Sequence, residues 1–270
     1  MAQPTVAVIV PCHNYHRWLT DCVYSLLLRR PGMYRPLRMI TVHDGCDGAS
    51  DEIVKSGDAA TQECICILQS KNRGVSVARN RGLDAIGNAK YVWFLDADDM
   101  AIPGGIERRM EYLEAHPDVD MVWGNALKIN VDRGNWDWSY DQCMKGLRKL
   151  ERYSRWMNAQ TLLWRREVFA EFGGYYEPLR SKEDKELIYR LGIHPDSPFK
   201  PRIKAKHLDV DVAIYRRHPD AKHKMRVADK KWFAECERVF AERMKQLKRE
   251  GITHQNTRFP VWAEAALTEK

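Results

Sequence analysis

The sequence has no Cys-x-x-Cys pair, no long apolar run and no linker rich in Pro, Gly and Ser. Its seven cysteines are an odd number with spacings unlike a zinc ribbon or a disulfide framework, which favours a reducing compartment. No segment reaches the ~18 apolar residues that cross a bilayer, and the first residues lack the basic-then-apolar pattern of a signal peptide. We therefore expect a soluble, cytoplasmic protein.

Length and charge indicate one large domain with an asymmetric surface. The chain has 270 residues, enough to bury a substantial core. Residues 1–130 carry 14 Lys/Arg against 16 Asp/Glu, a net charge of −2, whereas residues 131–270 carry 30 against 21, a net charge of +9. The asymmetry points to an anionic partner of the second half, although a basic surface that only aids solubility fits it as well.

Strands and helices are expected to alternate in the first half. Apolar runs predict strands at 5–10, 37–42, 64–68 and from 91, and helical spacing of apolar residues predicts helices at 17–29, 51–56 and 75–86. Pro11 is expected to end the first strand, because proline cannot donate to a central ladder. This order predicts an open α/β sheet whose parallel strands end at one edge, where a nucleotide would bind.

The second half is less regular. Its pattern predicts strands at 119–123, 162–164 and 210–216, helices at 106–115, 166–172, 185–191 and 229–249, and an aromatic turn at 135–140.

The run YVWFLDADD, residues 91–99, is the most informative stretch. Its apolar part is typical of a strand buried on both faces, and it ends in Asp96, Asp98 and Asp99. Carboxylates this close repel one another unless a cation lies between them, so the run implies a divalent ion, Mn²⁺ or Mg²⁺. A solvated acidic turn that caps the helix near Ile102 is the alternative.

Six segments together resemble the family 2 glycosyltransferases with the GT-A fold. They are, in order, VAVIVPCHN, VHDGCDGASDE, NRGVSVARNRGLDAI, YVWFLDADD, EVFAEFGGYYEP and SKEDKELIYRLG, and the likeness covers about residues 5–195. It implies a mostly parallel, Rossmann-like α/β sheet flanked by helices, with a C-terminal extension on the acceptor side. Residues 1–130 would bind the nucleotide sugar, residues 131–227 would supply the acceptor site and the base, and residues 228–270 would form a helical extension.

The resemblance implies a donor site for a nucleotide diphosphate sugar, with a UDP-sugar favoured. Asp44 would accept a hydrogen bond from the imide of a uracil-type base, and Pro11 and Asn14 would line the same cleft. Arg73 and Arg79 flank a helix N-terminus suited to the diphosphate. His43 departs from the family pattern, which usually has a second acidic residue there, so recognition of the base or ribose is open.

The same resemblance implies the metal ligands. Asp96 and Asp98 would hold the ion that bridges the two donor phosphates. The late Arg217-His218 pair would add a phosphate contact and a third ligand, although a histidine before proline is also an ordinary loop residue.

Catalysis would follow an inverting displacement. Asp184 would be the base that accepts the proton of the acceptor hydroxyl, and Glu183 would orient it or contact the acceptor. A Glu-Asp pair at the start of a helix is also a common charge–dipole arrangement. No covalent glycosyl-enzyme is required, because the metal would stabilise the leaving diphosphate.

The sequence says less about the acceptor site than about the donor site. Trp136 and Trp138 would stack on sugar faces or lie in the core, whereas Trp164 is expected in the core. Lys222, Lys224 and Arg226 belong to a basic stretch, 200–231, that would attract an anionic acceptor.

We therefore expect single sugar transfers to a hydroxyl acceptor, either an anionic envelope glycan or a lipid-linked glycan. Hydroxymethylated DNA is an alternative acceptor. A nucleic-acid-binding protein on an inactive GT-A scaffold is the alternative from another class, but it leaves the aspartates at the sheet edge unexplained.

Overall fold

The structure is a computed structural model that describes residues 6–27, 37–46, 64–131, 140–147, 150–153, 157–218, 229–253 and 255–263. Its strands are β1 (Val6–Cys12), β2 (Leu37–Asp44), β3 (Cys64–Gln69), β4 (Tyr91–Phe94), β5 (Met100–Ala101), β6 (Met121–Asn130), β7 (Glu151–Tyr153), β8 (Leu162–Arg165) and β9 (Ala205–Arg217). Its helices are α1 (His16–Leu27), α3 (Val75–Asp84), α4 (Gly105–Ala115), α5 (Tyr140–Gly146), the 3₁₀ turn η2 (Ala159–Thr161), α6 (Glu167–Phe172), α7 (Glu183–Arg190) and α9 (Lys230–Glu250).

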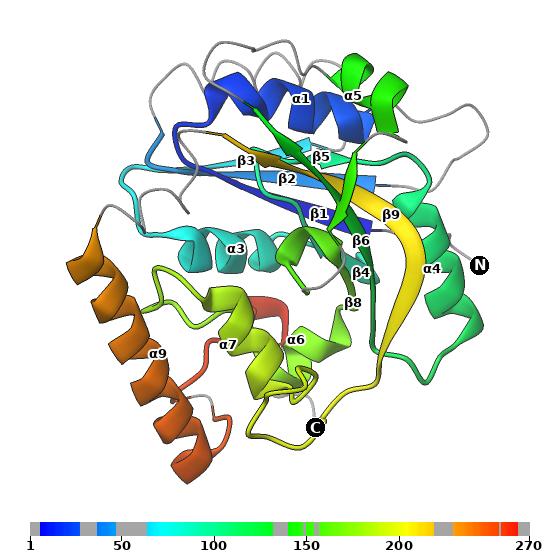
Figure 1. Cartoon of the computed structure of the whole chain (residues 1–270). Helices are drawn as coiled ribbons and strands as arrows, with labels where there is room; N and C mark the ends of the chain where they lie inside the picture. The colour runs from blue at the N-terminus through cyan, green and yellow to red at the C-terminus, as the bar shows by residue number, and fades with distance from the viewer. Residues whose placement is uncertain are drawn as a thin grey trace.

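These strands form one sheet in the order β3-β2-β1-β4-β8-β6-β9-β5, with β7 paired to β6. The strands β3, β2, β1 and β4 are parallel, so their carboxyl ends share one edge. Antiparallel β8 joins them to β6, which pairs in parallel with β9. Helices α1 and α5 lie on one side of the sheet, and α3, α6 and α7 lie on the other (Figure 1).

The first strand is longer than predicted, and the expectation that Pro11 ends it is wrong. β1 runs to Cys12, with Pro11 opposite Val42 of β2. The carbonyl of Ile9 faces the β4 side, where it accepts the N–H of Leu95 at 3.0 Å. Pro11 lies two residues further and faces the same side, beyond the last β1–β4 pair. Its missing N–H therefore removes no ladder hydrogen bond.

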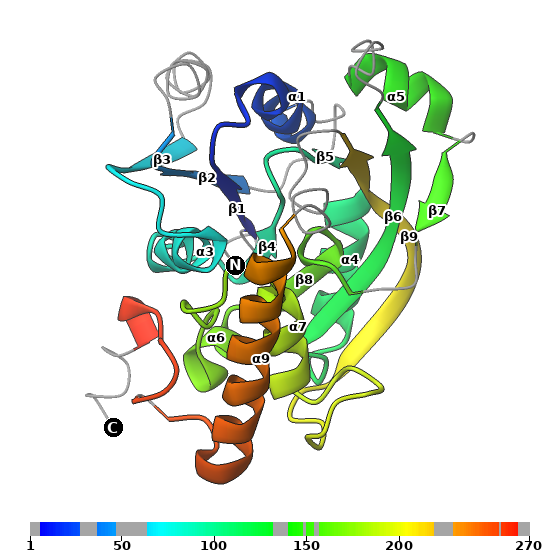
Figure 2. The same cartoon turned by 60° about the vertical axis from the view of Figure 1, so that its left-hand side comes forward.

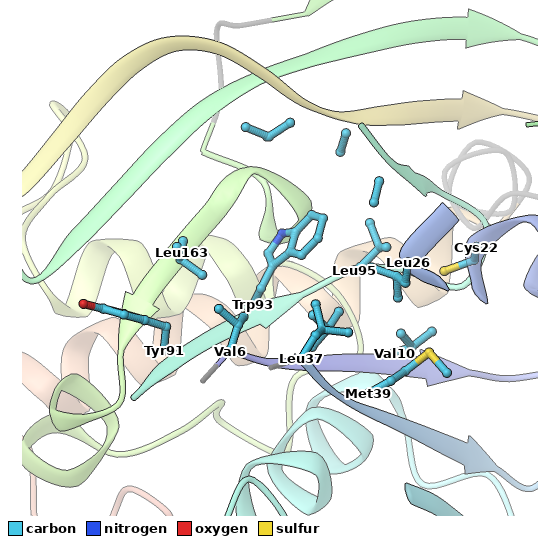
Figure 3. Packing of buried hydrophobic residues seen from close by; sticks show 14 of the residues in the cluster. Val6, Val10, Cys22, Leu26, Leu37, Met39, Tyr91, Trp93, Leu95 and Leu163 are labelled. Carbon is cyan, nitrogen blue, oxygen red and sulfur yellow. The ribbon is translucent and has the colours of Figure 1, made fainter. Parts of the chain in front are cut away.

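The buried apolar strands explain the core. Val6, Val10, Trp93 and Leu95 point to one face of the sheet, where they pack with residues of α1 and α4 (Figure 3). The alternate residues of β1 and β4 point to the other face, toward α3, α6 and α7. The expected core position of Trp164 is confirmed, since its side chain is fully buried. Because both faces are covered, the carboxyl edge is the accessible part of these strands.

The C-terminal helix α9 lies along α7 (Figures 1 and 2). Phe240 of α9 contacts the ring of Tyr189 at a centroid distance of 5.9 Å. Beneath this contact, Glu186 of α7 is fully buried between Arg190 and Arg243, each with its Nε 3.0 Å from the same Glu186 oxygen. A buried carboxylate with two guanidinium partners ties the two helices together.

Two predicted elements lie outside the described residues: the helix at 51–56 and most of the aromatic turn at 135–140. β9 is longer than predicted, because its first part carries exposed polar residues that do not read as a buried strand. None of the helices in the described ranges combines the length and the apolarity needed to cross a bilayer.

Candidate active site

A cavity of about 1030 Å³ opens at the carboxyl edge of the parallel strands. Its sheet side is formed by the ends of β1, β2 and β4, which contribute Pro11, Asp44 and Asp96. The opposite side is formed by the start of α7 with Asp184 and by the first turn of α9 with Trp232. Residues from both halves of the chain therefore face one space.

Arg79 of α3 joins the two sides of the cavity. Its guanidinium lies 2.8 Å from Asp96 and 2.8 Å from Asp184, and 3.3 Å from Glu183. The side chain is only 2% exposed, and its charged end lies 4.9 Å from the ring centre of Tyr175. The prediction placed Arg79 at a donor phosphate, whereas in this structure its guanidinium holds three carboxylates.

Asp184 has the electrostatics of a base that titrates near neutrality. Burial raises its pKa to about 6, and the repulsion of Glu183 and Asp96 adds to burial while Arg79 opposes it. The side chain remains 27% exposed toward the cavity. A carboxylate in this state can accept a proton from a bound hydroxyl.

The backbone before α7 is unusual. Lys182 has φ of 65°, in the left-handed region that costs a non-glycine residue about 1 kcal/mol. Its ammonium contacts Glu237 of α9 and lies 5.4 Å from the ring centre of Phe240. Contacts to α9 therefore accompany the turn that presents Glu183 and Asp184 to the cavity.

The acidic run after β4 forms a cluster. One oxygen each of Asp96, Asp98 and Asp99 lies within 4.8 Å of the others. Asp99 is buried and accepts the backbone N–H of Arg216 at 3.0 Å, whereas Asp96 and Asp98 line the cavity. Burial raises the pKa of Asp96, and the charge of Asp98 adds to this rise. Two carboxylates that face the same cavity and repel each other are suited to a hard divalent cation.

His218 lies beside this cluster. Its Nε2 is 3.1 Å from an Asp98 carboxylate oxygen, and the ring is fully buried against Trp18 at a centroid distance of 4.6 Å. The second ring nitrogen, Nδ1, has no hydrogen-bond partner among the described residues. An imidazole with two carboxylates is an oxygen and nitrogen donor set that fits Mn²⁺ as well as Mg²⁺.

Asp44 is the last residue of β2 and lines the cavity. Its two carboxylate oxygens accept the backbone N–H groups of Arg73 and Gly74, each at 2.7 Å. Gly45 next to it has φ of +65°, and a side chain there would come within 2.3 Å of the backbone nitrogen of Asn72. The carboxylate thus fixes the loop before α3. Its Oδ1 also accepts the side-chain amide of Gln69 at 3.4 Å, so only Oδ2 keeps a second lone pair.

The other predicted residues are placed as follows. Arg217 is exposed and lines the cavity, whereas Arg73 and Asn14 are exposed and lie outside its lining. Asn14 has φ of 57°, so it shapes the turn that follows β1. Five predicted acceptor residues lie outside the described residues: Trp136, Trp138, Lys222, Lys224 and Arg226.

Sequence reasoning missed the role of Arg216. This residue is fully buried, and its guanidinium lies 2.8 Å from Asp21 and donates to the backbone carbonyls of Trp18 and Asp98. It therefore holds the backbone of the acidic run in place. The available signal was its position in an apolar strand pattern, where a lone arginine requires buried partners.

Comparison with protein families gives one match over most of the chain. The family model "Glycosyl transferase family 2" matches residues 7–175. Among curated proteins, the uncharacterized glycosyltransferase EpsJ of Bacillus subtilis is 28% identical over 229 residues, which is 81% of this chain and 62% of EpsJ. This chain thus spans less than two thirds of the length of that relative.

Two solved structures show the same fold. S. aureus TarS 1–349 in complex with UDP-GlcNAc superposes with a TM-score of 0.65 at 16% identity, covering 88% of this chain and 65% of that one. The mannosyltransferase PcManGT from Pyrobaculum calidifontis, in complex with GDP-Man and Mn²⁺, gives a TM-score of 0.60 at 17% identity, covering 83% and 60%. The predicted GT-A fold is confirmed.

Proposed function

The chain belongs to glycosyl transferase family 2, and on this premise we propose that it transfers one sugar at a time from a nucleotide diphosphate sugar to a hydroxyl acceptor. The transfer is inverting and depends on a divalent metal. The acceptor is a glycan, either an anionic envelope glycan or a lipid-linked one.

One observation carries the proposal. The Arg79 guanidinium contacts Asp96, which follows β4, and Asp184, which begins α7, each at 2.8 Å. The carboxylate of the acidic run and the carboxylate proposed as the base therefore share one cation inside one cavity. An acceptor hydroxyl at Asp184 would lie next to a sugar whose diphosphate is held at the acidic run, which is the proximity that direct displacement needs.

Each group has a distinct role in this proposal. Asp184 accepts the proton of the attacking hydroxyl, and Glu183 keeps Arg79 in place beside it. Asp96, Asp98 and His218 would hold Mn²⁺ or Mg²⁺, which stabilises negative charge on the leaving diphosphate when it is bound. Arg217, exposed at the cavity, contacts the same phosphates.

The donor is proposed to be a UDP-sugar. Oδ2 of Asp44, at the end of β2, accepts one backbone N–H and keeps acceptor capacity for the imide of a uracil. Pro11 lines the same end of the cavity. TarS with UDP-GlcNAc supports this donor class and PcManGT with GDP-Man and Mn²⁺ supports metal use, so a guanosine donor belongs in the test.

Calorimetric titration with a panel of nucleotide sugars, first with Mn²⁺ and then with a chelator, tests the donor site. We expect selective binding of one diphosphate sugar, lost on chelation. An equal response to all nucleotides, or none to any, would contradict the proposal.

The base is tested by Asp184→Asn, with Asp118→Asn as an exposed control far from the cavity. We expect the first variant to keep donor and Mn²⁺ binding while nucleotide release with water as acceptor falls by about 10²- to 10⁴-fold. If its rate matches that of the control, another base must be sought.

A further inference from the structure

The cations that line the cavity fall into two groups. Lys128 lies 2.8 Å from Glu151, Lys182 contacts Glu237, and Arg79 holds the three carboxylates described above. Arg180, Lys185 and Arg217 also line the cavity, and within the described part of the chain none of these three has a carboxylate partner. The proposed function uses only Arg217 of this second group.

Arg180 and Lys185 lie on either side of Asp184 in the sequence, and both reach the cavity. Arg180 extends toward the start of α3, where its guanidinium nitrogen would be 2.6 Å from a side-chain carbon added at Gly74. The exposed guanidinium therefore borders the cavity on the α3 side. Its charge is compensated neither by hydrogen bonds nor by ion pairs to described residues.

Lys185 borders the cavity on the α9 side. Its ammonium lies 4.8 Å from the ring centre of Tyr189 and 5.6 Å from that of Phe240. These aromatic faces orient the ammonium without neutralising it, because a ring supplies only a quadrupole. Lys185 therefore presents a full positive charge next to the proposed base.

The wall of the cavity is partly apolar. Met157, Ile188 and Trp232 line it, and Trp232 is held at the first turn of α9, where its backbone N–H donates to Asp229 at 2.9 Å. An indole beside separate cations is suited to a sugar ring with charged substituents. The same wall fits a nucleic acid less well, since phosphate binding along a strand needs a continuous row of cations.

We propose that Arg180 and Lys185 form an anion subsite for the acceptor, and that the acceptor is a phosphorylated glycan. This inference rests on the proposed function, because it takes Asp184 as the point that the acceptor hydroxyl reaches. Each cation binds phosphate of the acceptor from its own side of the cavity, Arg180 through its planar guanidinium and Lys185 as a point charge. The phosphate belongs either to a phosphodiester within the glycan or to a lipid phosphate at its end.

Binding measurements on the full chain test this subsite. The donor site is first filled with Mn²⁺ and the nucleotide selected by the calorimetric panel, so that no probe enters it. The probes are a glycerol phosphate oligomer, neutral maltohexaose, phosphatidylcholine vesicles with phosphatidic acid, and oligothymidylate. The variants are Arg180→Gln, Lys185→Gln and their combination. Arg81→Gln on α3 and Lys248→Gln on α9 are exposed controls outside the cavity lining.

We expect the oligomer or the vesicles to bind the wild type at least tenfold more tightly than the double variant, with maltohexaose unaffected and both controls unchanged. Binding of the oligomer assigns a glycan phosphodiester, and binding of the vesicles alone assigns a lipid phosphate. Nucleotide affinity should stay within twofold in every variant.

Three results overturn the inference. Equal phosphate binding by the double variant and the wild type, with normal nucleotide binding, removes the subsite and leaves the proposed function standing. A parallel loss of nucleotide affinity in Arg180→Gln assigns Arg180 to the donor instead. Tighter, variant-sensitive binding of oligothymidylate identifies a nucleic acid as the partner.

Discussion

Replacing Arg79 by glutamine removes the cation that contacts Asp96, Glu183 and Asp184. In the native protein the pKa of Asp184 is already raised to about 6 by burial, and Arg79 opposes that rise. Without the guanidinium, the pKa values of Asp96 and Asp184 rise further. We therefore expect Arg79→Gln to destabilise the fold, and to do so more strongly as the pH increases.

The size of the effect follows from the burial of the cluster. Removing one partner of a fully buried ion pair costs about 3–5 kcal/mol. Asp96 and Asp184 are 35% and 27% exposed, so water replaces part of the lost interaction. We expect a loss of about 3 kcal/mol in the free energy of unfolding near pH 8, where the carboxylates must be charged. Near pH 5 they are protonated in the variant, and the loss should shrink to about 1 kcal/mol.

The physical argument fixes the direction in which the free energy of unfolding changes with pH. A carboxyl group whose pKa is higher in the folded state binds more protons there than in the unfolded chain, so stability falls as the pH rises through that pKa. Urea unfolding at three pH values measures the gap between variant and wild type. Arg81→Gln, an exposed position on the same helix, is the control and should show no pH-dependent gap. A gap that is constant with pH, or below about 1 kcal/mol near pH 8, would refute the role assigned to Arg79.

Three further predictions concern the site. The rate of donor turnover should increase with pH through about 6, because Asp184 acts as a base only when deprotonated; a rate that falls over this range would exclude it. Asp98→Ala should abolish the Mn²⁺ dependence of nucleotide binding in calorimetry, and unchanged affinity with and without chelator would remove the metal role. Contact with the Cys12 thiol, followed by His43, lowers the pKa of Cys46. Mass spectrometry should thus find Cys46 alkylated by iodoacetamide faster than the buried Cys12, and equal rates would contradict this.

The sheet was largely predictable from the sequence. β1, β2 and β4 are short apolar runs, which are typical of strands buried on both faces. The length of β9 was not predictable, because its first part carries exposed polar residues on a sheet edge. The extension of β1 through Pro11 required knowing where β4 stops, which is tertiary information.

The acidic half of the site was easier to identify than the cationic half. Asp96, Asp98 and Asp184 stand in recognisable motifs, and the structure brings all three to one cavity. The partners of Arg79 could not be predicted, because the sequence around an arginine on a helix does not show whether its side chain contacts solvent, a phosphate or carboxylates. The partners of Arg216 were not predicted either, although the residue stands at the end of the strand expected at 210–216.

The junction between α7 and α9 has a consequence for engineering new specificity. α9 supplies Trp232 to the wall of the cavity. It is attached through Phe240 against Tyr189, through Glu237 to Lys182, and through the buried Arg243, which contacts Glu186 and Thr257. A helix from another enzyme could therefore replace α9 if it kept a glutamate at 237, an aromatic residue at 240 and an arginine at 243. Under the proposed function, chimeras of this kind would alter the choice of acceptor and leave the donor site at the sheet edge intact.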